Sequence, residues 1–282
     1  GDISMQENIL DAVIIKGDGL PTYHFAHVVD DHLMRTTDVI RADEWIASIP
    51  LHVEMFQLLD LPVPRYTHLS PIMKNESKKD GTGISRRKLS KRKDPEARVG
   101  YYDEAGYPVP AVLDYLLTIS SADYEPWRET NMDASIFEFG LDLAKSGVAG
   151  ALFDFDKLNN VAKKRIGHMS EEQIFSAVSA WAERYDPRLN SYIQNNREFF
   201  RKSISVWHEK RLDVAKWSDL MELYPYMYDP TFAVDANTLP EMFLPHKERI
   251  FDILEDYLTS FSYDDNATEW FSKVKEVAIK HN

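Results

Sequence analysis

A dense cluster of basic side chains is the first feature of this sequence that could carry chemistry. Six Lys and Arg occupy eight consecutive positions in "RRKLSKRK", residues 86–93, just before an Asp-Pro pair. Between residues 74 and 98, ten Lys and Arg stand against four Asp and Glu, although the whole chain has a formal charge of −13. Mobile cationic groups suit a polyphosphate whose charge shifts during a reaction. The cluster predicts a phosphate-binding loop, and the alternative is a solvated charged loop.

Two details of this cluster favour the phosphate-binding interpretation. Leu89 lies inside the charge run and would give a loop an apolar anchor. Lys88 and Lys91 are three residues apart, so both could face one phosphate group. Residues 74–94 are predicted to be a polar loop longer than the usual connection of ~4–6 residues, which favours a functional role.

The elements that must position this loop follow from hydrophobic spacing in the first part of the chain. Short β-branched or apolar runs predict strands at 12–16, 37–45 and 66–73, and helical spacing predicts helices at 22–34 and 49–61. Strands that alternate with helices imply a parallel sheet, whose polar chemistry gathers at the carboxyl ends of the strands.

The remainder of the chain has a helical pattern. Apolar spacing predicts helices within 108–120, 170–185, 245–261 and 267–280, and Ser170 with Gln173 forms a capping-box pattern. The predicted buried faces are Leu51, Met55, Leu58 and Leu59 in the helix at 49–61, and Val109, Val112, Leu113, Leu116 and Leu117 in the helix at 108–120. No convincing strand follows about residue 125. The sequence therefore predicts an α/β part followed by an all-α part.

Composition limits the class of protein. With 44% apolar and 12% aromatic residues among 282, the chain can bury a core. No apolar run approaches the ~20 residues that span a bilayer, and no export signal is visible. Zero cysteines exclude disulfides and Cys-type zinc sites. We expect a soluble, cytoplasmic protein with no membrane partner and no protein-bound zinc.

Several motifs together resemble one family. The "KLSKR" run at 88–92 resembles the lysine-rich signature of class I aminoacyl-tRNA synthetases in its glutamyl/glutaminyl form. Residues 18–45 resemble the stretch before this signature in glutamyl-tRNA synthetases, residues 91–119 resemble the stretch after it, and residues 153–166 resemble the helical stem-contact region. The resemblance implies the second half of a Rossmann-like nucleotide-binding fold at 1–125, a helical stem-contact region at 126–212 and the start of a helical anticodon-binding region at 213–282.

The resemblance also implies roles for individual residues. Lys91 would contact ATP and help to stabilise its phosphates while the aminoacyl adenylate forms, with Lys88 as the second catalytic lysine. The other residues implied in ATP binding are Leu89, Ser90, Arg92, Trp45, Ile72 and Met73.

Three residues are implied in a glutamate pocket. Tyr23 would line it, and Arg41, at the end of a predicted strand, would hold the amino acid by a carboxylate, for which a planar guanidinium is suited. His27 stands where some family members have an amide side chain, and its protonation would influence carboxylate binding. Glu44 would lie near the tRNA acceptor end.

The implied cofactors and partners follow from the same resemblance. They are ATP with its Mg²⁺, L-glutamate and tRNA-Glu, with tRNA-Gln left open as a further substrate, and the protein is expected to be a monomer. His24, His27 and Asp31 have helical spacing that a metal site could use, but the resemblance already explains this stretch, so no protein metal site is expected.

One signature of the family is missing. None of the nine histidines lies in a His-x-Gly-His motif, so we expect an internal part of a longer glutamate–tRNA ligase that is inactive by itself. The alternatives are a glutaminyl-type synthetase, which would place β-barrels after the catalytic region, a glutamyl-queuosine synthetase, which would lack the long helical part, and a non-catalytic RNA-binding or interaction module.

A final group of aromatic residues predicts a helical core in preference to a base-stacking surface. These are Trp207, Trp217, Tyr224, Tyr226, Tyr228 and Phe232.

Overall fold

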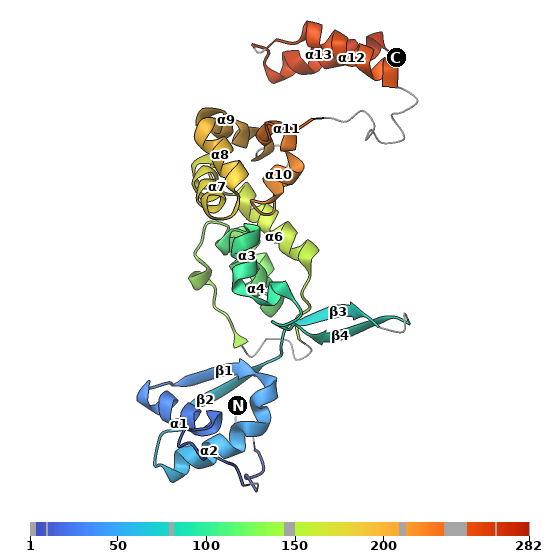
Figure 1. Ribbon diagram of the computed structural model, residues 1–282. Helices are drawn as coiled ribbons and strands as arrows, with labels where there is room; N and C mark the ends of the chain where they lie inside the picture. The colour runs from blue at the N-terminus through green and yellow to red at the C-terminus, as the bar shows by residue number, and fades with distance from the viewer. Residues whose placement is uncertain are drawn as a thin grey trace. The chain divides into compact units, whose positions relative to one another are not determined.

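The computed structural model describes the larger part of the chain (Figure 1). The described residues are 4–9, 11–78, 82–143, 150–208, 213–233, 247–262 and 264–281. The chain divides into two compact units, Gly1–Asp229 and Pro230–Asn282. Strands and helices alternate at the start of the first unit and helices follow, which confirms the predicted α/β and all-α order. The division into segments at 125 and 212 stays a prediction.

Two parallel strands and two helices form the first part of the larger unit. Its elements are α1 (Tyr23–Leu33), β1 (Asp38–Ala42), the 3-10 helix η1 (Asp43–Ser48), α2 (Ile49–Leu58) and β2 (Arg65–Leu69). The strands pair in register, with Arg41 opposite His68. Val28 of α1 packs with Met55 and Phe56 of α2 in a small buried core. Both predicted helices are confirmed, and so is a strand within each of the ranges 37–45 and 66–73, although residues 43–45 belong to η1 and Met73 begins a separate strand.

The strand predicted at 12–16 is wrong. Within this run only Ile15 forms a β-bridge, to Pro21 across the turn at Gly17-Asp18-Gly19. Val13 is 69% and Ile15 50% exposed, so these side chains lack the packing that stabilises a strand. The β-branched composition alone was therefore a misleading signal.

The prediction of one continuous polar loop at 74–94 is wrong, because residues 74–77 and 84–88 lie in strands. Met73–Ser77 (β3) and Ile84–Lys88 (β4) form an antiparallel hairpin, drawn as two adjacent arrows in Figure 1. Lys74 lies opposite Arg87, and the Arg87 side chain reaches Glu76 at 3.0 Å. Ion pairs supply the cross-strand contacts that apolar residues usually provide, which explains why no strand pattern was visible.

The buried face of α2 differs from the predicted one. Met55 is buried and Leu51 packs beside it, but Leu58 is 77% exposed. His52 and Phe56 occupy the face instead, with exposed fractions of 0% and 1%. Apolar spacing does not predict the burial of His52, because this burial depends on hydrogen-bond partners from other elements.

The predicted face of α4 (Val109–Ser120) is also wrong in part. Val109 is 66% exposed, whereas Ala111, Asp114 and Tyr115 are buried. Asp114 is buried because Arg128 of α5 lies 3.0 Å from its carboxylate. A buried charge with an ion-pair partner follows no hydrophobic period.

The remaining elements are helical. They are the 3-10 helices η2 (Pro95–Ala97) and η3 (Ile136–Glu138), and the α-helices α3 (Val99–Ala105), α5 (Tyr124–Thr130), α6 (Phe155–Gly167), α7 (Glu171–Tyr185), α8 (Pro187–Asn195), α9 (Arg197–His208), α10 (Asp219–Leu223), α11 (Pro225–Tyr228), α12 (Lys247–Ser260) and α13 (Ala267–Lys280). The described part of the second unit contains α12 and α13, which pack against each other. The predicted capping box of Ser170 and Gln173 begins α7 and is confirmed.

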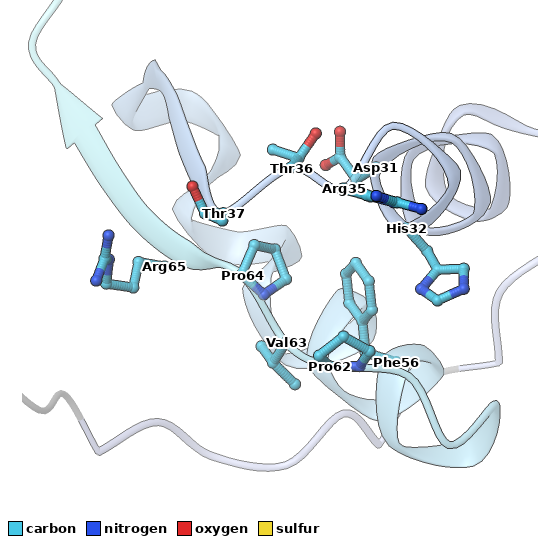
Figure 2. A pocket seen from close by; sticks show the side chains of 10 residues that line it. All are labelled: Asp31, His32, Arg35, Thr36, Thr37, Phe56, Pro62, Val63, Pro64 and Arg65. Carbon is cyan, nitrogen blue, oxygen red and sulfur yellow. The ribbon is translucent and has the colours of Figure 1, made fainter.

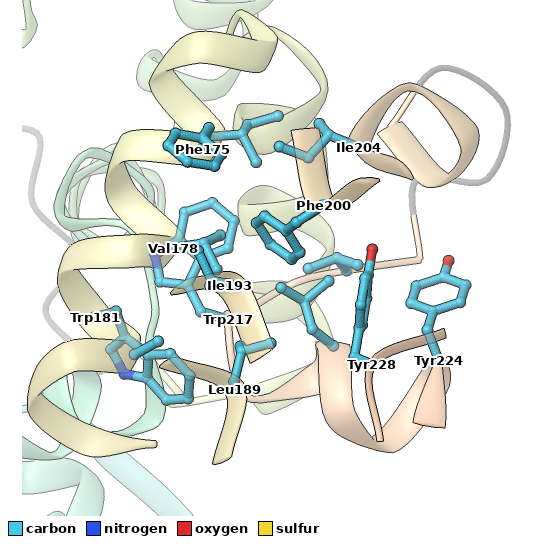
Figure 3. Close-up of a cluster of buried hydrophobic side chains, with 14 of the residues drawn as sticks. Phe175, Val178, Trp181, Leu189, Ile193, Phe200, Ile204, Trp217, Tyr224 and Tyr228 are labelled. Atoms are coloured by element: carbon cyan, nitrogen blue, oxygen red, sulfur yellow. The ribbon is translucent and has the colours of Figure 1, made fainter. Parts of the chain in front are cut away.

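Helices α7 to α11 enclose a large aromatic core, shown in Figure 3. Trp207, Trp217, Tyr224 and Tyr228 are each at most 4% exposed, which confirms the predicted core for these four residues. Tyr226 and Phe232 are exposed. A second core joins α4 and α6 and also receives Leu89 and Ile72.

A substitution at Gly106 can test the packing of the end of α3 against Trp181 and Trp217. Gly106 ends α3 with a φ of 86°, and a Cβ there would lie 2.9 Å from Trp217 N and 3.0 Å from Trp181 Cε2. We predict that Gly106→Ala lowers the free energy of unfolding by about 3 kcal/mol, because left-handed strain adds to a steric clash. Urea unfolding followed by tryptophan fluorescence measures the change.

Two other glycines separate these causes. Gly19 has a φ of 84°, and nothing lies within 4 Å of the position that a Cβ would take, so Gly19→Ala should show the backbone strain alone, about 1 kcal/mol. Gly17→Ala, with open space and no positive φ, serves as the reference. An equal loss in Gly106→Ala and Gly19→Ala would contradict the steric part of the prediction.

Candidate functional site

Arg41 is held at the carboxyl end of β1 by partners from three elements. Its Nε donates to His68 Nε2 of β2 at 3.0 Å, its Nη1 lies 3.3 Å from His52 Nδ1 of α2, and its Nη2 donates to the Trp45 carbonyl at 3.3 Å. The guanidinium carbon lies 4.8 Å from the centre of the Tyr66 ring, a cation–π distance. The site is therefore built from the strand end and the elements next to it, as parallel sheets favour.

Tyr23 and His27 lie on α1 in the same group of side chains. Their rings are stacked with centroids 5.8 Å apart, and Tyr23 is 4.4 Å from the Trp45 ring. His27 Nε2 lies 3.1 Å from Tyr66 OH, and its Nδ1 lies 3.0 Å from Asp31. The structure thus brings together Tyr23, His27 and Arg41, the residues that sequence analysis placed in one pocket, and adds Trp45.

Sequence analysis missed four members of this group. They are His24, His52, Tyr66 and His68. His24 Nδ1 lies 2.9 Å from His52 Nε2, so a chain of contacts runs from α1 through α2 to Arg41. His52 on an otherwise apolar helix was the one available signal, since a polar residue on a buried face needs partners.

Burial lowers the pKa of three histidines in this group, His27, His52 and His68. It lowers the pKa of His52 to about 3, and the neighbouring His27 and Arg41 act in the same direction. Burial also lowers the pKa of His27, although the Asp31 carboxylate opposes the shift, and lowers the pKa of His68. Near neutral pH the group therefore has Arg41 as its central cation.

The basic signature begins at the end of the β3–β4 hairpin. Lys88 is the last residue of β4, and the Leu89 amide donates to the Ile72 carbonyl at 2.8 Å. Leu89 also packs into the core between α4 and α6, so it anchors the turn as the sequence predicts. Ser90 then begins a tight turn, in which its carbonyl accepts hydrogen bonds from the amides of Lys93 and Asp94.

A buried carboxylate holds this turn in place. Asp94, 2% exposed, accepts two hydrogen bonds from Arg87, at 2.6 and 2.7 Å, and one from the Ser90 amide at 2.9 Å. Lys74 Nζ lies 3.3 Å from the same carboxylate and also contacts Glu96. The hydrogen bonds from Arg87 hold the pKa of Asp94 well below its usual range.

The signature lysines differ in their surroundings. Lys88 Nζ lies 2.5 Å from Glu44 Oε2, so the residue predicted near the tRNA acceptor end pairs with a residue predicted to bind ATP. Lys91 and Arg92 are exposed on the turn, and in the part of the chain that the structure describes neither has an ion-pair partner. These two cations are thus available to an anionic ligand.

The other predicted ATP-binding residues fall into two places. Ile72 packs beside Leu89, and the Met73 amide donates to the Ala151 carbonyl at 2.7 Å, next to the signature. Trp45 belongs to the Arg41 group. The Lys88–Glu44 ion pair connects these places, since Glu44 precedes Trp45 in η1.

A cavity of about 540 Å³ lies elsewhere in the same part of the molecule (Figure 2). Arg35 and Thr37, at the end of α1 and the start of β1, line it together with Phe56 and Arg65. It lies at the amino ends of the strands, whereas Arg41 lies at the carboxyl end of β1. None of the predicted site residues lines the cavity, although Asp31, which pairs with His27, does.

Among the described residues, no group of three or more His, Asp or Glu side chains is arranged to hold a metal ion. In that same portion of the chain, no helix has the length and apolarity needed to cross a bilayer.

Comparisons with known proteins add to this geometry. Residues 1–138 match the family described as tRNA synthetases class I (E and Q), catalytic domain. A glutamate–tRNA ligase of Clostridium beijerinckii is 43% identical over 99% of this chain and 50% of its own length. The corresponding protein of Sorangium cellulosum is 38% identical over 99% of this chain and 51% of its own length.

Solved structures agree with these relatives. A crystal structure of a glutamate tRNA ligase from Elizabethkingia meningosepticum, in complex with its amino acid, superposes with a TM-score of 0.65 at 26% identity, over 96% of this chain and 53% of that chain. Residues 1–138 thus belong to the catalytic-domain family of class I aminoacyl-tRNA synthetases of the glutamyl and glutaminyl type. Within that class the chain is related along its length to the glutamate–tRNA ligases, and it spans about half the length of the curated relatives it matches.

The Asp94 network can be tested by removing its charge. We predict that Asp94→Asn lowers the free energy of unfolding by about 3 kcal/mol, because it removes a buried carboxylate that accepts two hydrogen bonds from Arg87 and one from the Ser90 amide. Asp38→Asn is the matched control, since Asp38 pairs with Arg65 through a similar two-point contact that is exposed to solvent. Equal stability changes in the two variants, measured by urea unfolding, would refute the special role of Asp94.

The buried His52 predicts a pH dependence of stability. Its pKa is about 3 in the folded chain and near 6.5 in the unfolded chain, so between these values the unfolded state binds the additional proton. The free energy of unfolding should therefore fall as pH decreases from 6.5 to 4.5, by at most about 1.4 kcal/mol per pH unit from this one group. Urea unfolding at several pH values measures the slope, which His52→Gln should reduce. Substitution of the exposed His168 by Gln provides the reference, and an unchanged slope in His52→Gln would contradict the prediction.

Proposed function

We propose that this chain forms part of a glutamate–tRNA ligase, which activates glutamate with ATP and transfers it to tRNA. The observation that carries the proposal is the basic turn at 88–92, anchored by Leu89 and Asp94 with Lys91 and Arg92 exposed. Cations held on a fixed turn can follow the phosphates of ATP as their charge redistributes. The 38–43% identity to glutamate–tRNA ligases supports the same function.

In this proposal Lys91 is the main catalytic residue. Its ammonium would stabilise the negative charge of the phosphates as the glutamate carboxylate attacks the α-phosphorus and pyrophosphate leaves. Lys88, Ser90 and Arg92 complete the signature. Lys88 is already paired with Glu44, whereas Lys91 has no ion-pair partner among the described residues, so the two lysines have different starting states. Mg²⁺ would be held by phosphate oxygens and water, which it prefers.

The Arg41 group is proposed to bind the amino acid. Arg41 would pair with a carboxylate of glutamate, while Tyr23 and His27 line the pocket. Trp45, Ile72 and Met73 are proposed to lie near the adenosine. Glu44, close to Lys88, could then respond to both ATP and the tRNA acceptor end.

The helical part supports a glutamyl-type protein over a glutaminyl-type one. The described residues after 125 form the helices α6 to α13, in place of the β-barrels expected for a glutaminyl-type synthetase. This region is proposed to contact the tRNA stem and anticodon. The chain alone is proposed to be inactive, because half of the catalytic fold cannot align both substrates.

The role of Lys91 can be measured in the longer protein that contains this chain. We predict that Lys91→Ala slows glutamate-dependent ATP–pyrophosphate exchange on the order of 100-fold, because a charge-stabilising donor is lost at the transition state. The thermal unfolding midpoint should not change, since the side chain is exposed.

Lys93→Ala is the matched control for this experiment. Lys93 is also exposed and lies two positions away, but it is outside the signature. Its exchange rate should stay within about threefold of the unsubstituted protein, as expected for a surface charge without a specific contact. Similar rates for the two variants would remove the basis for the phosphate role.

A further inference from the structure

Arg41 differs from three other arginines of the fold in the type of partner it has. Arg87, Arg65 and Arg128 each pair with an Asp carboxylate. The hydrogen-bond partners that the described residues offer to Arg41 are two imidazole nitrogens and a backbone carbonyl, with no carboxylate in an ion pair. Its position is thus fixed while its charge is left uncompensated.

The donor and acceptor roles in this group follow from Arg41 itself. A guanidinium can only donate, so His52 Nδ1 must accept and therefore carries no proton. The proton of a neutral His52 then lies on Nε2, from which it is donated to His24 Nδ1 at 2.9 Å. His24 must accept at that nitrogen, so both rings have their proton on Nε2.

The same logic fixes the opposite form of His68. Its Nε2 accepts from Arg41 Nε at 3.0 Å, so a neutral His68 has its proton on Nδ1. A proton added to the accepting nitrogen of His52 or His68 would break a hydrogen bond and place a second cation next to the guanidinium. The geometry therefore requires neutral rings around Arg41.

We propose that His52 is a positioning residue: together with His24 and His68 it forms a neutral cradle that orients Arg41 and leaves the guanidinium charge to a carboxylate ligand. The identity of that ligand as glutamate rests on the proposed function. An aspartate or glutamate at position 52 could hold the guanidinium equally well, but it would neutralise the charge that the ligand needs. A neutral acceptor can orient the guanidinium of Arg41 without neutralising its charge.

The other charged groups around the cradle are compatible with this role. On α1, Asp31 pairs with His27, and Tyr66 of β2 contacts His27 from the other side. Asp43 of η1 favours the charged form of His68, but burial and Arg41 outweigh it and lower the pKa of this ring. The 0% exposure of His52 keeps water from replacing its contacts.

The cradle is tested directly by nuclear magnetic resonance of the 282-residue chain with ¹⁵N-labelled histidine and arginine. At pH 7 and without ligand, we expect the Nε2–H form for His24 and His52 and the Nδ1–H form for His68. Substitution of each histidine by Gln assigns its signals. A charged His52 or an Nδ1–H form of this ring would overturn the proposal, and this measurement requires no variant to retain function.

Two variants, made in the longer protein that contains this chain, then separate the orientation of Arg41 from its charge, with glutamate as the probe. His52→Gln keeps one acceptor and one donor, so the dissociation constant of glutamate should stay within about threefold of the unsubstituted protein. His52→Glu can orient Arg41 but neutralises it, so the affinity should fall by about 10- to 100-fold. Dispersed methyl signals show that each variant is folded.

The possible outcomes distinguish this inference from the proposed function. Equal glutamate affinity of His52→Glu and the unsubstituted protein would overturn the claim about charge. If the unsubstituted longer protein does not bind glutamate, the assignment of Arg41 to a carboxylate ligand fails together with the proposed function. The expected protonation forms would still support His52 as the residue that positions Arg41.

Discussion

The buried carboxylate of Asp94 is the constraint on which the basic signature depends. It accepts hydrogen bonds from Arg87 on β4 and from the Ser90 amide in the turn, and Lys74 on β3 lies close to it. One side chain therefore joins both strands of the hairpin to the turn that follows. Because a buried carboxylate needs several donors to remain charged, the contacts of Asp94 fix the backbone from which Lys91 projects.

This arrangement separates the basic residues of the cluster into two groups. Lys74 and Arg87 are used within the fold, where they neutralise Asp94, Glu76 and Glu96. Lys91 and Arg92 are held at the surface. The positive charge that stands out in an acidic chain is thus partly structural, and only the remainder is available to a phosphate.

Arg41, unlike Arg87, is held without a carboxylate partner among the described residues. Its group uses neutral imidazoles and a carbonyl, so orientation is achieved without an opposing charge. The Lys88–Glu44 pair lies between the Arg41 group and the basic turn. Two sites that would serve different substrates are consequently connected through one ion pair, which a ligand at either site could open.

The sequence was sufficient where one local signal decided the structure. The β-branched run before Arg41 predicted β1, the Ser170–Gln173 pattern predicted the start of α7, and the ordered motifs around "KLSKR" indicated the family. The sequence did not predict the structure correctly where contacts between distant residues determined it. The hairpin at 73–88 is held by ion pairs instead of apolar alternation, and the run at 12–16 has no neighbouring sheet to join among the described residues.

For the candidate site, the sequence by itself determined which residue types were present: Tyr23, His27, Arg41 and the signature lysines. Only the tertiary structure decided the partners of those residues. His52 lies on α2, 11 residues after Arg41 of β1, and Asp94 lies in the turn 7 residues after Arg87 of β4, so no periodicity within a single helix or strand reveals either contact. The burial of a polar side chain depends on donors and acceptors that distant elements bring to it, and this information exists only after the chain has folded.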